Sequence, residues 1–147
     1  MKIKHILFPT DFSEGSEAAV DYVKSLAAQY SSKVTLLYVI EEFGKTQGWY
    51  VPHISLDEFY KEMEANAKKK LEHCSYEEMR DIETDRVVLK GRPDEEILNY
   101  ADSGDVDLIV MGTQSKSGMD ILFGSTAIKV LRKSKCPVFC VKVPPAR

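Results

Sequence analysis

The residues best suited to chemistry lie in one stretch of small and hydroxyl-bearing residues, GTQSKSGMDILFGST, which spans residues 112–126. Glycine and hydroxyl residues at both ends of a loop let backbone N–H groups close around a phosphate. Gly124, Ser125 and Thr126 begin a helical pattern, so free amides and the helix dipole would point at a bound anion. The stretch therefore predicts a phosphate-binding loop, although a plain N-cap explains Gly124 and Ser125 nearly as well.

The motifs of an enzyme are missing from the chain. It has no G-x-S-x-G nucleophile elbow and no complete G-x4-G-K-[ST] loop. His5, His53 and His73 lack the spacing of metal ligands. Lys116 could meet a phosphate as a point charge, but a solvated lysine is the simpler interpretation. The sequence favours a binding protein over an enzyme.

Length and charge limit the class of protein. A chain of 147 residues fits one domain with one core, and we treat residues 1–147 as a single domain. The net charge of −3 argues against a general binder of nucleic acid or anionic membranes. No apolar run reaches the roughly 18 residues of a membrane span. The N-terminal apolar run stops at Pro9, which favours a first strand over a signal peptide, so a cytoplasmic location is expected.

The remaining elements alternate along the chain. Apolar runs predict five strands, at Ile3–Phe8, Lys33–Ile40, Thr84–Leu89, Asp107–Met111 and Pro137–Val143. The first helix follows a cap at Asp11 or Ser13, and the second follows the capping-box pattern of Ser55 and Glu58. The second helix carries one apolar stripe, made of Phe59, Met63, Ala67 and Leu71. A third helix starts within Gly91–Glu96, and a fourth covers Ser125–Lys133.

This alternation predicts an α/β fold, a doubly wound parallel sheet with helices on both faces. In such Rossmann-like sheets a ligand binds beyond the carboxyl ends of the strands, where the winding reverses. Two loops that follow strands suit a ligand there. One is Pro9–Thr10–Asp11, and the other begins at Met111 and Gly112.

Five motifs together resemble those of the universal stress protein family. They are FPTDFS, LLYVIE, GRPDEEI, DLIVMGTQ and GSTAIKVLRKSKCPVFCVKV, and they fall in the family's order from one end of the chain to the other. The resemblance implies a five-stranded sheet with strand order 3-2-1-4-5. It also implies that many relatives bind ATP between the ends of strands one and four, that others bind no nucleotide, and that both kinds form homodimers through the last strand.

The resemblance assigns site residues one by one. Relatives that bind ATP show G-x2-G-x9-G-[ST]; here Gly112 matches the first glycine and Gly124–Ser125 the last pair, whereas Ser115 replaces the second glycine. Residues 116–123 leave the intervening segment one residue short. Positive φ costs a serine roughly 1–2 kcal/mol, against about 8 kcal/mol for micromolar binding, so the substitution alone does not abolish binding.

Other matches complete the predicted site. Asp11 matches a carboxylate that accepts ribose hydroxyls, Pro9 and Thr10 match the floor of an adenine pocket, and Val39 matches a residue whose backbone reads adenine. Asp11 could equally cap the first helix, and Val39 fits a plain sheet core. The predicted set is Pro9, Thr10, Asp11, Val39, Met111, Gly112, Ser115, Gly124, Ser125 and Thr126, with no catalytic residue and no metal ligand.

The expected protein is a dimeric stress-response module that binds ATP or AMP, with Mg²⁺ as a candidate companion ion. The alternative is a family member that binds no nucleotide and acts as a dimeric interaction protein; ATP hydrolysis is expected to be slow at most. The apolar last strand, with Phe139 and Val141, favours pairing of two copies, whereas Lys142 is a counter-sign. Trp49 and Tyr50 are expected to pack or to contact a partner.

Overall fold

Five parallel strands form the centre of the computed structural model, which describes residues 1–42, 56–73, 79–113 and 124–143. The strands are β1 (His5–Pro9), β2 (Lys33–Glu41), β3 (Thr84–Gly91), β4 (Leu108–Gly112) and β5 (Val138–Val141). They lie in the order β3-β2-β1-β4-β5, and every neighbouring pair is parallel. This confirms the predicted doubly wound sheet, in which the winding reverses between β1 and β4.

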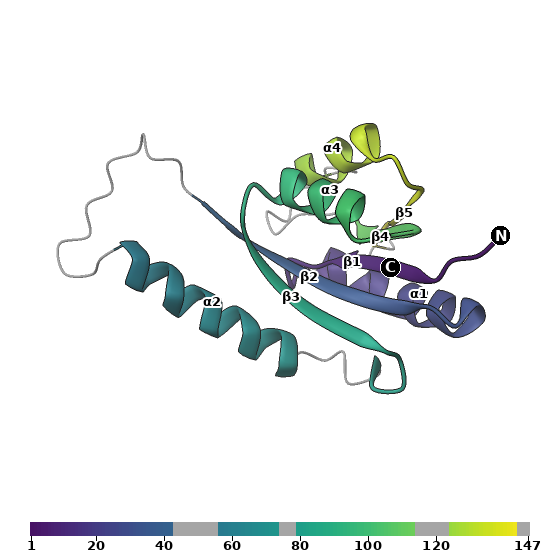
Figure 1. Ribbon diagram of the computed structural model, residues 1–147, viewed down its shortest axis with the longest axis horizontal. Coiled ribbons are helices and arrows are strands. Elements are labelled where there is room, and N and C mark those ends of the chain that lie inside the picture. Colours follow the sequence, from purple (N-terminus) through teal and green to yellow (C-terminus); the bar gives the residue numbers. More distant parts are fainter. Residues whose placement is uncertain (43–55, 74–78, 114–123, 144–147) are drawn as a thin grey trace.

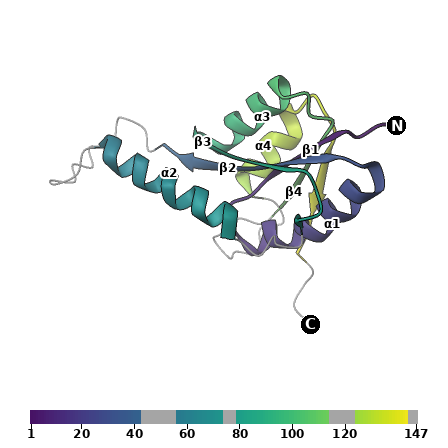
Figure 2. The ribbon, with the colours of Figure 1, turned by 60° about the horizontal axis from the view of Figure 1, so that its bottom comes forward.

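Two helices cover each face of the sheet (Figures 1 and 2). Helices α1 (Glu14–Tyr30) and α2 (Leu56–His73) lie on one face, where Ala19, Val23 and Leu71 share a core cluster with residues of β1, β2 and β4. Helices α3 (Pro93–Ser103) and α4 (Ser125–Lys133) cover the other, where Ile97 and Val130 pack with their own cluster. In the described part of the chain, no helix is long and apolar enough to cross a membrane.

The apolar stripe of α2 differs from the sequence expectation. Phe59 is 40% exposed, whereas Tyr60, Ala67 and Leu71 are buried and Met63 is partly buried. Steps of four residues advance about 40° around a helix at each step, so a 59-63-67-71 stripe drifts off the sheet. The 60-63-67-71 stripe has one step of three followed by two steps of four, so its four positions stay within about 80° of one another on one face. Ser55, the first residue of the predicted capping box, lies outside the described residues.

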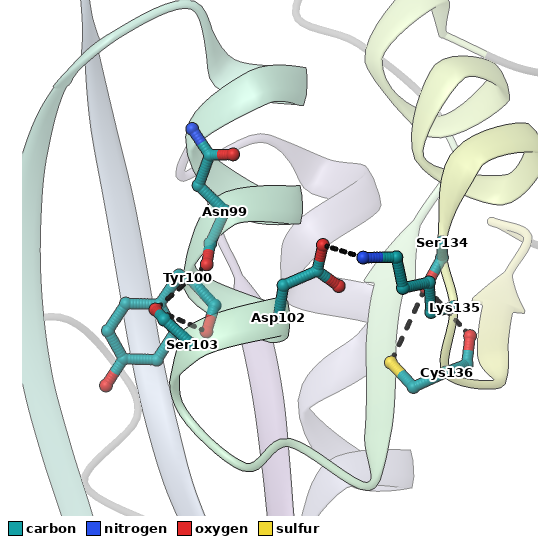
Figure 3. Close-up of polar contacts among 7 residues, drawn as sticks. All are labelled: Asn99, Tyr100, Asp102, Ser103, Ser134, Lys135 and Cys136. Atoms are coloured by element: carbon teal, nitrogen blue, oxygen red, sulfur yellow. Dashed lines mark hydrogen bonds and ion pairs between the residues drawn. The ribbon is translucent and has the colours of Figure 1, made fainter.

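A set of polar contacts connects the end of α3 to the turn before β5 (Figure 3). Ser134 Oγ donates to the Cys136 carbonyl at 2.8 Å, and Lys135 Nζ lies 3.0 Å from Asp102 Oδ2. The Lys135 side chain is largely exposed, so this ion pair adds little stability. These contacts are made from the turn between α4 and the first residue of β5, Val138.

A pair of alanine substitutions tests the corrected stripe. Tyr60→Ala should lower the free energy of unfolding by about 3 kcal/mol, because it removes a buried ring. Phe59→Ala, at the exposed position immediately before Tyr60, should cost less than about 1 kcal/mol. Urea denaturation measures both values. Equal losses would show that α2 presents Phe59 to the sheet.

Candidate functional site

A cleft of about 410 Å³ opens at the carboxyl edge of the sheet, where the winding reverses. Its volume falls within the roughly 300–1,000 Å³ of sites for small molecules. Nine predicted residues line it: Pro9, Thr10, Asp11, Val39, Met111, Gly112, Gly124, Ser125 and Thr126. The tenth, Ser115, lies outside the described residues together with Lys116, Trp49 and Tyr50. Segments far apart in sequence therefore meet in one cleft.

Asp11 turns the chain from β1 into α1. Its Oδ1 accepts hydrogen bonds from the Ser13 N–H and from Ser16 Oγ, each at 2.9 Å. The next residue, Phe12, has a φ of 60°, and its ring packs on Tyr38 at 5.1 Å. The helix cap is Ser13, whose side chain accepts from the Ser16 N–H. Of the two roles open to Asp11, the N-cap thus belongs to Ser13.

The second carboxylate oxygen of Asp11 is available to a ligand. Within the described ranges, Oδ2 makes no hydrogen bond, and the same residues contain no buried side-chain oxygen or nitrogen that lacks a partner. Oδ2 is therefore accessible to solvent, and Asp11 lines the cleft. An accessible carboxylate oxygen is a strong acceptor for a hydroxyl group.

Val39 presents its backbone to the cleft because β2 is longer than its neighbour β1. The Lys33 N–H donates to the carbonyl of Lys4, just before β1. The Val34 N–H donates to the carbonyl of Glu83, just before β3. Odd-numbered residues of β2 thus face β1 and even-numbered ones face β3, since successive backbone groups alternate in a parallel strand. The last bond to β1 is from the Thr10 N–H to Leu37. Beyond it, the N–H and C=O of Val39 point to where β1 has ended.

The N-terminus of α4 supplies the positive end of the cleft. Gly124 is the N-cap with φ −64°, and its N–H donates to the Thr113 carbonyl. Among the described residues, no side chain caps α4, and no acid lies in its first turn, whereas α1 and α3 begin with acidic residues. The described lining contains no Lys or Arg. Among the described groups, those that attract an anion there are the backbone N–H groups and the dipole of α4.

Carboxylates give the β1–β2 side of the cleft the opposite charge. Asp11 and Glu41 line this side together with Tyr38. Burial raises the pKa of the Tyr38 hydroxyl above its usual range, and the charges of Asp11 and Glu41 raise it further. Tyr38 therefore stays protonated at neutral pH. The cleft combines hydrogen-bond acceptors on this side with N–H donors at α4, an arrangement that suits a ligand with both hydroxyls and an anionic group.

Gly112 is a glycine for a reason that lies outside the cleft. A Cβ built at this position would lie 2.1 Å from the Gly15 carbonyl oxygen and 2.8 Å from the Ser16 nitrogen. The backbone of the first turn of α1 thus packs directly on the end of β4. The predicted role, a glycine that admits a phosphate, is not needed to explain this residue.

Several lining residues were not predicted from the sequence: Ser16, Leu37, Tyr38, Glu41, Met63, Pro93, Ile97, Thr113 and Ala127. Thr113 directly follows β4, and Pro93 lies two residues beyond the end of β3, so the rule of strand carboxyl ends could have found them. Ser16 lies in the first turn after a predicted cap, which is a weaker signal. Met63 reaches the cleft from the middle of α2, and no local pattern in the sequence indicates that.

Substitution of Gly112 tests the packing of α1 on β4. Gly112→Ala should lower the free energy of unfolding by about 1–3 kcal/mol, because the added methyl group overlaps backbone atoms that cannot rotate away. Urea denaturation of the ligand-free protein measures this loss. An unchanged midpoint would show that α1 moves aside at no cost.

Comparisons with known proteins agree with this architecture. The model of the "Universal stress protein family" matches residues 2–142. The universal stress protein MJ0577 of Methanocaldococcus jannaschii is 35% identical over 154 residues, which cover 95% of this chain and 94% of that protein. Its solved structure superimposes with a TM-score of 0.80 at 34% identity, with 99% of this chain and 100% of that chain covered.

Two more distant structures share the fold and carry nucleotides. The universal stress protein of Archaeoglobus fulgidus in complex with dAMP is 23% identical, with a TM-score of 0.66 over 97% of this chain and 100% of that one. A universal stress protein in complex with cAMP is 21% identical, with a TM-score of 0.65 over 97% of this chain and 98% of that one. From the family match and the identity to MJ0577, the chain belongs to the universal stress protein family.

Proposed function

We propose that this protein binds one adenine nucleotide, ATP or AMP, per subunit and acts as a dimeric regulatory or interaction module in a stress response. The observation that carries the proposal is that one cleft joins an accessible Asp11 carboxylate oxygen to the N-terminus of α4, which no described side chain caps. Two family members of the same fold were solved with dAMP and with cAMP, which supports a nucleotide as the ligand.

Each part of the cleft suits one part of the nucleotide. Asp11 Oδ2 accepts a ribose hydroxyl. The backbone N–H and C=O of Val39 provide one donor and one acceptor for the edge of adenine, and Met111 and Ile97 supply apolar surface beside it. The N–H groups of Ser125 and Thr126 lie in the first turn of α4 and receive a phosphate. Asp11 and Glu41 would repel a phosphate, so the phosphate lies toward α4.

A binding role fits these residues better than a catalytic one. The described lining includes no His, Cys or Lys that could serve as a base or a nucleophile. Outside residues 43–55, 74–78, 114–123 and 144–147, no group of three His, Cys, Asp or Glu is placed to hold a metal ion. Slow ATP hydrolysis would be compatible with binding and would not by itself define an enzyme.

The β5 edge supplies the proposed dimer contact. Phe139 is 39% exposed and packs on Tyr22, itself 50% exposed, with ring centroids 5.6 Å apart. Leu131 of α4 is 49% exposed. Helices α1 and α4 both contact β5, so apolar side chains flank this edge strand on both faces. An edge of this kind is stabilised when it pairs with a second copy across a two-fold axis.

Titration with ATP tests the proposed ligand. Calorimetry of the purified protein should give one site per subunit, and ATP should raise the melting temperature because it binds the folded state. Absence of both heat and a melting shift at millimolar ATP would reject nucleotide binding and leave the family's alternative, a dimeric interaction protein without nucleotide.

A bulky residue at Gly124 tests the position of the phosphates. Gly124→Val should abolish detectable ATP binding, because its side chain projects beside the first N–H groups of α4. The φ of −64° at this N-cap is accessible to valine, so circular dichroism should show an intact fold. Unchanged affinity would place the phosphates elsewhere.

Charge on β5 tests the dimer. Phe139→Asp should convert the protein to a monomer, because it buries a carboxylate in the proposed contact. Leu56→Asp is the matched control: Leu56 is 63% exposed on α2, and the dimer should persist. Solution scattering at micromolar concentration gives the mass. A monomeric wild-type protein would contradict the proposed contact.

A further inference from the structure

The Ser16 hydroxyl occupies a central position beside the proposed ribose site. Ser16 is only 6% exposed, lies in the first turn of α1 and lines the cleft. Its Oγ donates to Asp11 Oδ1 at 2.9 Å and accepts from the Asp11 backbone N–H at 3.2 Å. One hydroxyl thus bonds both the main chain and the side chain of the same aspartate.

This pair of bonds fixes the orientation of the carboxylate. Because the Asp11 N–H and Oδ1 are held by one atom, rotation about the Cα–Cβ bond would break the bond to Oδ1. The Ser13 N–H, which also bonds Oδ1 at 2.9 Å, adds a third constraint. Both restraining donors use Oδ1, so Oδ2 is the oxygen left for a ligand. An acceptor already held in its binding orientation loses less conformational entropy when a hydroxyl arrives.

The start of α1 does not require the Ser16 hydroxyl. The N-cap is the Ser13 side chain, whose Oγ accepts from the Ser16 backbone N–H at 3.3 Å and donates to Ser16 Oγ only at 3.5 Å, the long limit of a hydrogen bond. Any residue at position 16 retains that N–H, and alanine is a better helix former than serine. The two shorter bonds of this hydroxyl, at 2.9 and 3.2 Å, both go to Asp11, so its main contacts are with Asp11 rather than with the helix cap.

We propose that Ser16 is a positioning residue that orients Asp11 and thereby makes the cleft selective for ribonucleotides over deoxyribonucleotides. The inference rests on the proposed adenine-nucleotide site and adds its sugar specificity. A fixed Oδ2 bonds a ribose hydroxyl at one place, and a ligand that lacks this hydroxyl leaves the oxygen without its partner. A rotating carboxylate turns to water or to the remaining hydroxyl and discriminates less.

The experiment compares ATP, 2′-deoxy-ATP and 3′-deoxy-ATP by calorimetry on the full chain. The readout is the ratio of the dissociation constant of the weaker deoxynucleotide to that of ATP. For wild type this ratio should be about ten, as expected for a hydrogen bond to a charged acceptor. Ser16→Ala should reduce it at least about threefold, and Asp11→Asn should bring it close to one.

Ser32→Ala is the matched control for the loss of a buried hydroxyl. Ser32 is also 6% exposed, and its Oγ donates to the Ile3 carbonyl at the opposite edge of the sheet. This variant should lose stability much as Ser16→Ala does and keep the wild-type ratio. A merely structural role of Ser16 would change the melting temperature and leave the ratio unaltered.

The outcomes distinguish failure of the Ser16 inference from failure of the proposed nucleotide binding. Binding of ATP with the same ratio in wild type and Ser16→Ala would overturn the role of Ser16 and leave nucleotide binding intact. A wild-type ratio near one would overturn sugar selectivity. Absence of heat with all three nucleotides in the wild type would overturn both proposals. If Ser16→Ala does not fold, the wild-type and Asp11→Asn ratios still decide whether Asp11 discriminates.

Discussion

The cleft exists because β1 ends several residues before its neighbour β2 at the carboxyl edge of the sheet. β1 ends at Pro9, paired in register with Leu37, while β2 continues to Glu41 alongside β3. After its last bond to β2 at Thr10, the chain turns away through Phe12, whose positive φ is uncommon for a residue with a side chain. The projecting end of β2, the turn at Asp11 and the first turn of α1 become the walls of one cavity. A β1 that continued along β2 would fill that space with sheet.

Much of the fold could be predicted from the sequence because each element carries a strong local pattern. The apolar run before Gly112 identified β4, and α4 has the predicted bounds, Ser125–Lys133. The order of the strands came from the family resemblance, since alternation alone leaves the order open. The stripe on α2 was wrong at Phe59 because both Phe59 and Tyr60 are apolar enough to be buried, and only contact with Ile40 and the sheet selects Tyr60.

The candidate site could be predicted only in part, for physical reasons. Residues that directly follow strands were recognisable because parallel strands bring their carboxyl ends to one edge. Met63 and Ser16 depend on how helices pack, which a local pattern does not encode. The choice between Asp11 and Ser13 as the cap of α1 also needed three-dimensional contacts, since both residue types cap helices well. Ser115 and the shortened segment before Gly124 lie outside the described residues, so their effect on the phosphate loop stays a prediction.

Gly112 affects what the pattern G-x2-G-x9-G-[ST], of which it is the first glycine, can say about nucleotide binding. Any side chain at this position is excluded, because a Cβ would lie 2.1 Å from the Gly15 carbonyl oxygen of α1. A relative that binds no ligand would still need glycine at this position if its α1 packs against β4 in the same way. In this chain, the match at the first glycine of the pattern is therefore explained by helix packing and carries little information about a ligand. The more informative features are groups that the described fold does not use for its own contacts, such as the accessible Oδ2 of Asp11 and the acid-free first turn of α4.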